Sequence, residues 1–406
     1  MLSKARNVIR TRHRNKRRKI ENESRAKTSE TRRDIDEDLV PQDLVIEILR
    51  RLPVKSVARF LLVSKLWATI IRSREFIRSF PFQRSLIQPY RLLLAFKDLD
   101  NQNLRQIWNF FSSSSTSERL SYLSLTACSN ITSPYSRVND VLHYVNGLIN
   151  LGCGRQQIIC NPSTGKSTTL PKVRTRRNFI RSFLGSDPLD AQYNVLCMSQ
   201  KMYGKWRSQS FEHQVFTLGG VDKSWRMIEC NILHGPVTNG LCIDGVVYYG
   251  ALTGMSKNEC CLVRFNVRSE KFGQVVGFLG DHDTPPSLFS HISLIRYKGK
   301  VTLAIQIGIT RFELWALEDA EKHEWSKVCF SVHHLLHPSL RIRGDITHTD
   351  EIVFVVNPPG HFYFLYYDHQ KNIIVKSREY NSGKELMRRF SLMVPFTDYV
   401  ESVMLL

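Results

Sequence analysis

The distribution of apolar residues changes twice along the chain. Residues 1–33 contain almost no large apolar side chains, whereas residues 39–80 carry apolar positions at helical spacing. From Tyr90 onward, short apolar runs are separated by Gly, Pro, Asn and Ser, a pattern that is typical of β-strands joined by turns. These changes predict an N-terminal arm over 1–33, a helical domain over 34–82 and a mostly β domain over 88–400.

The helical region is organised around three apolar stripes, which are Leu44, Val45, Ile48, Leu49 and Leu52; Val57, Phe60 and Leu61; and Trp67, Ile70 and Ile71. Pro53 is expected to end the first helix and begin the second, and Ser64 has the side chain of an N-cap for the third. A bundle of about 40 residues is hard to stabilise by itself, and these apolar side chains exceed what it can bury. Part of the helical surface should therefore dock either on the β region or on another protein.

The β region contains six weakly similar units at intervals of about 45–55 residues, the range of kelch-like propeller blades. Their expected strands cover 91–96 and 104–111; 144–151, 157–160 and 167–170; 193–199, 214–218 and 224–232; 245–251, 261–267 and 271–278; 301–307, 312–317 and 325–330; and 351–356, 363–367 and 372–376. Residues 224–228 and 324–328 look like equivalent strands two units apart. Radial repetition protects the edges of many short strands, so the pattern favours a β-propeller of about six blades over its alternative, a two-sheet sandwich.

Five short motifs in the helical region follow one another in a recognisable order. They are Leu39-Val40-Pro41, Glu47-Ile48-Leu49, Leu52-Pro53-Val54-Lys55-Ser56, Arg59-Phe60 and Val63-Ser64-Lys65-Leu66-Trp67, and together they resemble the plant F-box. One departure is Leu61-Leu62, where many relatives carry a polar residue or a cysteine. The resemblance implies that these helices bind a Skp-type adaptor and, through it, a cullin. The residues that it assigns to the adaptor contact, directly or by shaping the surface, are Leu39, Pro41, Ile48, Leu49, Leu52, Pro53, Val63 and Trp67.

Segments of the β region are similar to the plant F-box-associated domain. They are Asn146–Ile149, Ile159–Gly165 with Leu170-Pro171, Trp225–Ile228 and Gly240–Tyr249. The expected fold is therefore α+β and multidomain, with a small three-helix F-box before a propeller. This resemblance implies a non-catalytic substrate receptor of an SCF-type ubiquitin ligase, whose β domain holds a target protein. Such a receptor acts by raising the effective concentration of target lysines, so it needs no nucleophile of its own.

Charge is concentrated in the N-terminal arm. The chain has a formal net charge of +20, and residues 1–33 hold thirteen Lys and Arg against three acidic residues. Such a segment cannot bury a core and should be disordered. Its basic cluster, Arg14, Lys16, Arg17, Arg18 and Lys19, resembles a nuclear import signal, which predicts a nuclear or cytoplasmic protein. Binding of nucleic acid by charge alone and a solvated tail without a specific role are the alternatives.

Short motifs that would indicate other chemistry each lack a required residue. Gly165-Lys166-Ser167-Thr168 would need a glycine at position 160 to form a phosphate loop, but Cys160 stands there, and Gly165 fits a hairpin turn instead. His333 and His337 lack the glutamate of a zincin motif, so these histidines are expected in surface loops. Nine scattered cysteines without a Cys-x-x-Cys pair indicate a reduced intracellular protein, and no apolar run is long enough for a membrane span. The sequence thus predicts no catalytic residue, metal site or cofactor, although an enzyme with its active site in the propeller is a further alternative.

Overall fold

The computed structural model describes residues 41–404, apart from 88–90, 101–104, 114–124, 135–141, 153, 178, 201, 204–205, 208–211, 254–258, 274–275, 278–291, 333–340, 343–350, 357–361 and 381–389. The chain divides into two compact units, Met1–Arg50 and Arg51–Leu406. No helix among the described residues is long and apolar enough to span a membrane.

The described part of the first unit is almost entirely helix α2 (Gln42–Arg51). The carbonyl of Pro41 accepts the backbone N–H of Val45 at 3.1 Å, and Asp43 in the first turn interacts favourably with the helix dipole. Val45 and Leu49 are buried, whereas Leu44 and Ile48 of the same predicted stripe are exposed. The apolar stripe of α2 is therefore wider than the surface that it buries.

Three more helices open the second unit: α3 (Val54–Phe60), α4 (Lys65–Arg72) and α5 (Arg74–Ile87). The N-cap predicted at Ser64 is confirmed, because its hydroxyl accepts the N–H of Trp67 at 3.2 Å. Ser73 has an extended backbone and its hydroxyl accepts the N–H of Phe76 at 3.2 Å. This second cap begins a helix that the sequence pattern did not separate from α4, so the structure has four helices in this region rather than three.

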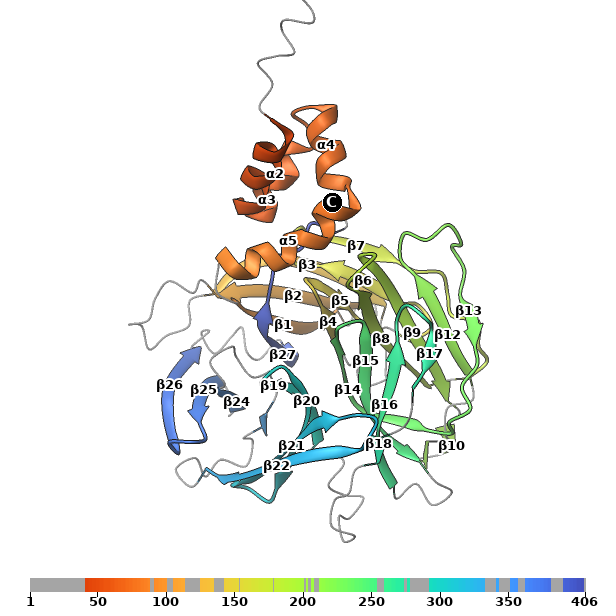
Figure 1. Ribbon diagram of the computed structural model, residues 1–406, viewed down its shortest axis with the longest axis vertical. Coiled ribbons are helices and arrows are strands. Elements are labelled where there is room, and N and C mark those ends of the chain that lie inside the picture. The colour runs from red at the N-terminus through yellow and green to blue at the C-terminus, as the bar shows by residue number, and fades with distance from the viewer. Residues whose placement is uncertain are drawn as a thin grey trace, which may run out of the picture. The chain divides into compact units, whose positions relative to one another are not determined.

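Six blades of antiparallel strands follow, arranged as a ring in Figure 1. In order from the inner strand outward, the first three blades are β27 (Phe390–Tyr399), β1 (Arg91–Asp100), β2 (Arg105–Ser113) and β3 (Leu125–Pro134); β4 (His143–Val145), β5 (Leu148–Asn150), β6 (Ile158–Asn161) and β7 (Lys166–Thr169); and β8 (Phe179–Asp187), β9 (Gln192–Gln200), β12 (Glu212–Thr217) and β13 (Arg226–Ile228). A hairpin of β10 (Met202–Tyr203) and β11 (Trp206–Arg207) lies between β9 and β12 in the chain.

The last three blades are β14 (Gly235–Ile243), β15 (Val246–Thr253), β16 (Glu259–Asn266) and β17 (Lys271–Phe272) with β18 (Val276–Gly277); β19 (Ile292–Tyr297), β20 (Lys300–Ile307), β21 (Arg311–Asp319) and β22 (Glu324–Ser331); and β23 (Arg341–Ile342), β24 (Ile352–Val356), β25 (Phe362–Asp368) and β26 (Ile373–Tyr380). The six-bladed propeller predicted from the repeats is confirmed, and the sandwich alternative is wrong. The proposed equivalence of 224–228 and 324–328 also holds, because β13 and β22 are outer strands two blades apart.

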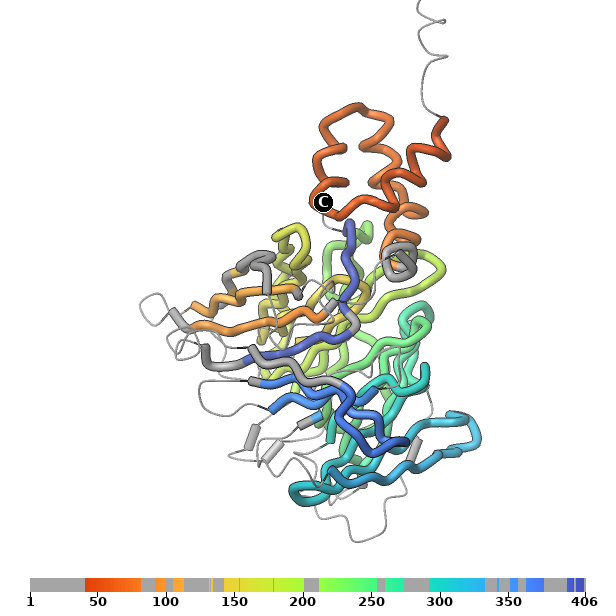
Figure 2. The backbone as a smooth tube through the Cα atoms, turned by 90° about the vertical axis from the view of Figure 1, so that its left-hand side faces the viewer, coloured from red at the N-terminus to blue at the C-terminus, as the bar shows by residue number. Residues whose placement is uncertain are grey.

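The ring is closed by the two ends of the propeller. Strand β27 pairs antiparallel with β1, with Leu94 opposite Pro395 and Phe96 opposite Met393. Figure 2 shows the dark blue C-terminal strand running beside the orange strand that begins the domain. The first blade therefore combines three strands from the start of the β region with an inner strand from its end.

The C-terminal segment that follows β27 is held by the second blade. The side-chain amide of Asn161 donates to the carbonyls of Ser402 at 2.7 Å and Met404 at 2.8 Å. Gly147 has a positive φ of +85°, and a Cβ at this position would lie 2.5 Å from that of Ser402. Within the second unit, the carboxylate of Glu401 accepts the backbone N–H of Val54 at 3.2 Å, which caps α3.

Neighbouring blades pack face to face through apolar side chains. Between the third and fourth blades, the rings of Phe183 and Tyr249 stack with centroids 4.7 Å apart. The inner strands β8 and β14 approach so closely that a Cβ at Gly240 would lie 2.5 Å from the Phe183 ring, and a Cβ at Gly185 would lie 2.5 Å from the side chain of Val267 in the fourth blade. Each blade thus depends on its neighbours for a complete core.

The hairpin turn predicted at Gly165 is confirmed. Gly165 has a φ of +72°, its N–H donates to the carbonyl of Asn161 at 3.0 Å, and Asn161 pairs with Lys166 across the turn. Lys166 is exposed and begins strand β7 rather than a helix. A phosphate loop is therefore absent at this position.

Candidate interaction surfaces

Helix α2 exposes large apolar side chains. Leu44 has 54% and Ile48 45% of its surface accessible, and both lie on the outer part of the predicted apolar stripe. A solvated helix face normally carries polar or charged residues at such positions. The exposed pair is therefore suited to a protein contact that this unit does not make by itself.

The second unit exposes a further apolar group around the junction of α3 and α4. Leu62 is 90%, Val63 59% and Leu66 40% exposed. The junction is ordered because a ring contact joins the two helices. The rings of Phe60 in α3 and Trp67 in α4 stack with centroids 4.7 Å apart and an interplanar angle of 18°. An ordered turn thus presents three large apolar side chains to solvent, which is a feature of interaction sites.

The predicted adaptor residues fall into three groups. Pro41, Ile48, Pro53 and Val63 are exposed, Leu52 and Trp67 are half-buried, and Leu49 is fully buried. Leu39 lies outside the described residues. Leu49 can act only by supporting the helix, whereas the exposed residues are free to touch a partner.

Three exposed apolar residues were missed in the sequence: Leu44, Leu62 and Leu66. Leu44 belonged to a recognised stripe, but periodicity cannot tell which edge of a wide stripe stays in solvent. Leu62 was noted only as a departure from the family pattern. Its nearly complete exposure shows that the departure enlarges the apolar surface at this junction.

The helices of the second unit are also strongly basic. Between residues 51 and 79 there are seven Lys and Arg but one acidic residue, Glu75. A partner of these helices is therefore expected to carry acidic groups around an apolar contact.

The propeller has two topologically different ends. In an antiparallel blade, the turns between the first two and the last two strands lie at one end, and the remaining turn and the connection to the next blade lie at the other. At the first end the turns between the inner two strands are tight, as between Val145 and Leu148, Ile243 and Val246, and Tyr297 and Lys300. The second end carries all six connections between blades, the longest joining Gly277 to Ile292.

Within the second unit, helix α5 and the C-terminal segment lie at the end with the tight turns. The guanidinium of Arg78 in α5 donates to the carbonyl of Leu189 in the β8–β9 turn at 3.1 Å. Exposed apolar residues are found at both ends: Leu189 and Val221 at the first, Leu233 and Ile309 at the second. The second end is thus the one without these helical contacts among the described residues.

Comparison with known protein families agrees with this architecture. An F-box domain matches residues 38–79 and an F-box associated β-propeller domain matches residues 91–400. The chain belongs to the plant F-box proteins with an F-box-associated domain. This confirms the family inferred from the motifs around Leu39–Trp67 and Asn146–Gly165.

Other F-box proteins are similar to this one over most of its chain. F-box protein At4g11590 of Arabidopsis thaliana is 45% identical over 90% of this chain and 93% of its own length. F-box protein At1g47810 of the same plant is 40% identical over 71% of this chain and 87% of its own length. Among solved structures, the nidogen/laminin complex is similar to this chain at 10% identity and a TM-score of 0.40, covering 75% of this chain and 98% of that one.

The basic arm lies outside the described residues, and so do His333 and His337. The import signal predicted at Arg14, Lys16, Arg17, Arg18 and Lys19 therefore stays a prediction. Three other histidines, for which no position was predicted from the sequence, are buried in the propeller: His143, His213 and His234.

Proposed function

We propose that this F-box protein is the substrate-receptor subunit of an SCF-type ubiquitin ligase and has no catalytic residues of its own. A family of F-box plus propeller proteins fits this role. The observation that carries the proposal is the set of exposed apolar side chains on the F-box helices, which include Ile48 and Val63. Each unit by itself offers exposed apolar side chains to a Skp-type adaptor, and the helices of the second unit add basic residues.

Adaptor binding is tested with Ile48→Glu and Val63→Glu. Both side chains are exposed, so the substitutions should leave the melting temperature unchanged. Burying a new carboxylate against an apolar partner should weaken affinity for a purified Skp-type adaptor at least tenfold, about 1.4 kcal/mol. Ile309→Glu is the matched control, because Ile309 is 55% exposed in the β20–β21 turn of the propeller. Equal affinities for all three variants would contradict this mode of binding.

The target protein is proposed to bind the end of the propeller that carries the connections between blades. This end lies opposite the turn that receives Arg78, and recognition commonly resides in longer connections on a rigid scaffold. Leu233 and Ile309 supply exposed apolar contacts there.

The two ends can be compared directly. The variant Leu233→Glu with Ile309→Glu is expected to lose proteins that are labelled next to the receptor in cells, while adaptor binding is retained. The control, Leu189→Glu with Val221→Glu, places the same charges at the opposite end. If the control loses the labelled proteins and the first variant keeps them, the assignment of the ends is reversed.

A further inference from the structure

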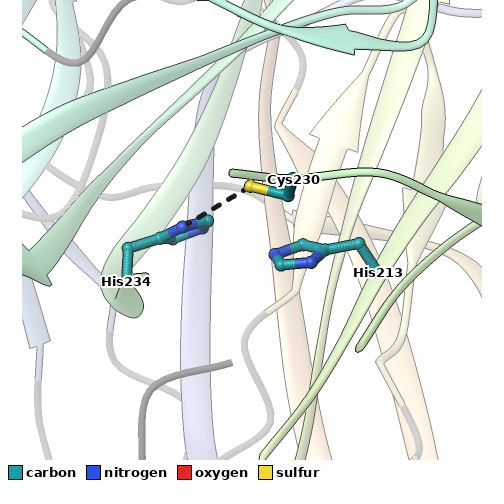
Figure 3. Close-up of side chains that lie close together, drawn as sticks. All are labelled: His213, Cys230 and His234. Atoms are coloured by element: carbon teal, nitrogen blue, oxygen red, sulfur yellow. Dashed lines mark hydrogen bonds between the residues drawn. The ribbon is translucent and has the colours of Figure 1, made fainter. Parts of the chain in front are cut away.

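Three side chains with metal-binding atoms meet between the third and fourth blades. His213 lies on β12, and Cys230 and His234 lie on the connection from β13 to β14. The ligand atoms of the three residues all lie within 4.8 Å of one another. In Figure 3 the thiol of Cys230 and the rings of both histidines point toward a common centre.

The two imidazoles are removed from solvent. His213 is 3% and His234 0% exposed, while Cys230 is partly buried. The Nε2 atom of His213 is buried, and the part of the chain that the structure describes gives it no hydrogen-bond partner. A buried ring nitrogen without a partner is costly, because it has lost water and gained nothing in return. A metal ion bound to this nitrogen would offset the cost, and two other ligand atoms lie close enough to bind the same ion.

The polar contacts around His234 also fit a ligand set. Nδ1 of His234 lies 4.0 Å from Sγ of Cys230 and 2.9 Å from the carbonyl oxygen of Ile232, and Nε2 lies 2.7 Å from the hydroxyl of Tyr249. A ring that binds metal through one nitrogen usually holds a hydrogen bond through the other. Tyr249, which is fully buried, can fill that second position.

Aromatic packing orients the two imidazole rings. The ring of Phe272 packs edge-on against His213 and His234, with centroids 5.0 and 5.9 Å away. Phe272 therefore fixes the orientation of both imidazoles beside Cys230.

We propose that His213, Cys230 and His234 bind one zinc ion. Two imidazole nitrogens and a thiolate are a ligand set that zinc accepts, with bonds of about 2.0–2.1 Å to nitrogen and about 2.3 Å to sulfur. Tetrahedral bonds of these lengths place sulfur and nitrogen about 3.6 Å apart. The separation of 4.0 Å between Cys230 and His234 needs only a small side-chain movement to reach it. A water molecule or the carbonyl of Ile232 completes the four-coordinate site.

Binding of zinc moves two protons in this site. The thiol of Cys230, which donates toward the carbonyl of Ile232 at 3.5 Å, loses its proton to solvent when sulfur binds the metal. When Nδ1 of His234 binds the metal, it releases the proton that it donated to the carbonyl of Ile232, and Nε2 takes up one proton, which it donates to the hydroxyl oxygen of Tyr249. One proton leaves the protein for each zinc ion, and the neutral histidines keep their charge state.

The ion would join segments that the backbone joins weakly. The outer strand β13 has three residues, and the connection from it to β14 carries both Cys230 and His234. A bond from this connection to His213 fixes the passage from one blade to the next. The zinc site is therefore a structural one, near the exposed Leu233 of the end proposed to hold the target.

Cobalt replaces zinc in such sites and makes the thiolate visible. The full chain, treated with a chelator and titrated with Co²⁺, is expected to bind one ion with a thiolate-to-cobalt charge-transfer band that Zn²⁺ abolishes. Cys230→Ser should lose this band, and His213→Gln should weaken Co²⁺ binding at least tenfold. Cys329→Ser is the control, because Cys329 is an exposed cysteine on β22 outside the cluster.

A second measurement on the unaltered chain avoids any loss of folding in the variants. Zn²⁺ should slow alkylation of Cys230 at least tenfold, as read by peptide mass spectrometry, and leave the rate at Cys329 unchanged. The proposal is overturned if Zn²⁺ protects neither cysteine or both equally. It is also overturned if the charge-transfer band survives in Cys230→Ser.

Discussion

The side-chain amide of Asn161 holds the main-chain carbonyl of Ser402, 241 residues later in the chain, at 2.7 Å. Its oxygen meanwhile accepts the N–H of Ser163 at 3.0 Å, so one side chain organises its own turn and anchors the C-terminus. Asn161 and Gly147 belong to the segments that resemble the F-box-associated domain. Their contacts with Ser402 give a physical reason for both residue types at these positions.

Asn161→Asp should destabilise the propeller by about 2–4 kcal/mol, because the donor to two carbonyls becomes a buried negative charge. The new side chain has nearly the same size and keeps the acceptor for Ser163. Urea unfolding followed by tryptophan fluorescence measures the change. Removal of residues 402–406 should itself lower the free energy of unfolding. In the shortened chain, Asn161→Asp should then lower it much less than in the full chain. Additive effects of the two changes would show that Asn161 acts elsewhere.

Gly147→Ala should cost more stability than Gly219→Ala. Both glycines have a positive φ, +85° and +68°, so both substitutions carry backbone strain of about 1–2 kcal/mol. A Cβ at Gly147 also meets the Cβ of Ser402 at 2.5 Å and the carbonyl of Val400 at 2.9 Å, whereas nothing lies within 4 Å at Gly219. We expect at least 1 kcal/mol of additional loss at Gly147 in urea unfolding. Equal losses would mean that the C-terminal segment moves aside without cost.

Stability should fall in mildly acidic solution because of His143. Burial lowers the pKa of its ring to about 3, and Nδ1 accepts the N–H of Leu184 at 2.7 Å. The unfolded chain, with an ordinary histidine pKa near 6.5, binds this proton more readily than the folded protein. The resulting stability is complete above about pH 6.5 and is lost as the pH falls toward 3, by about 2 kcal/mol between pH 7.5 and 5.

The contribution of His143 to the pH dependence of stability can be separated from that of other titratable groups. In His143→Asn the amide oxygen can still accept from Leu184, but no proton is taken up on unfolding. The variant should lose stability at pH 7.5, yet its unfolding free energy should depend on pH less steeply by about one proton. Identical slopes for the two proteins would assign the acid sensitivity to another residue.

Removal of residues 1–33 should change the location of the protein and not its stability. The arm is nearly free of large apolar side chains and contains the basic cluster Arg14 to Lys19. A fluorescent fusion of the full chain is expected to concentrate in the nucleus, and the shortened chain to spread into the cytoplasm. Melting temperature and adaptor binding should be equal for both. Equal distribution of the fusions would contradict an import signal in the arm.

Most middle and outer strands were predictable, β3 being an exception, but several inner strands were not. Strands such as β20 and β24 are short apolar runs bounded by turn residues. Near the axis, however, strands crowd one another, and β8 and β14 carry Gly185 and Gly240 where a Cβ would clash. Crowding therefore replaces apolar residues by small ones and removes the signal on which strand prediction depends. The pairing of β27 with β1 joins distant segments, which local patterns cannot show.

The interaction residues were predictable to the extent that a family motif named them. Ile48 and Val63 follow from the F-box pattern, but their exposure depends on how the helices pack. The cluster of His213, Cys230 and His234 was missed because its members do not form a metal-binding motif. Cys230 and His234 are four positions apart in a connection, and only the pairing of β12 with β13 brings His213 beside them.

Strand β27 also has a consequence for how the protein is made. Strand β27 is synthesised after all the other described strands of the propeller, so the inner edge of β1 has no partner until Phe390–Tyr399 has been made. A nascent chain with such an open edge is prone to aggregate and would need help from chaperones. A stop codon before Phe390 would leave the F-box helices attached to a ring that lacks this strand. Under the proposed function, such a shortened chain keeps its contact with the adaptor and acts as a dominant inhibitor rather than as a simple loss of function.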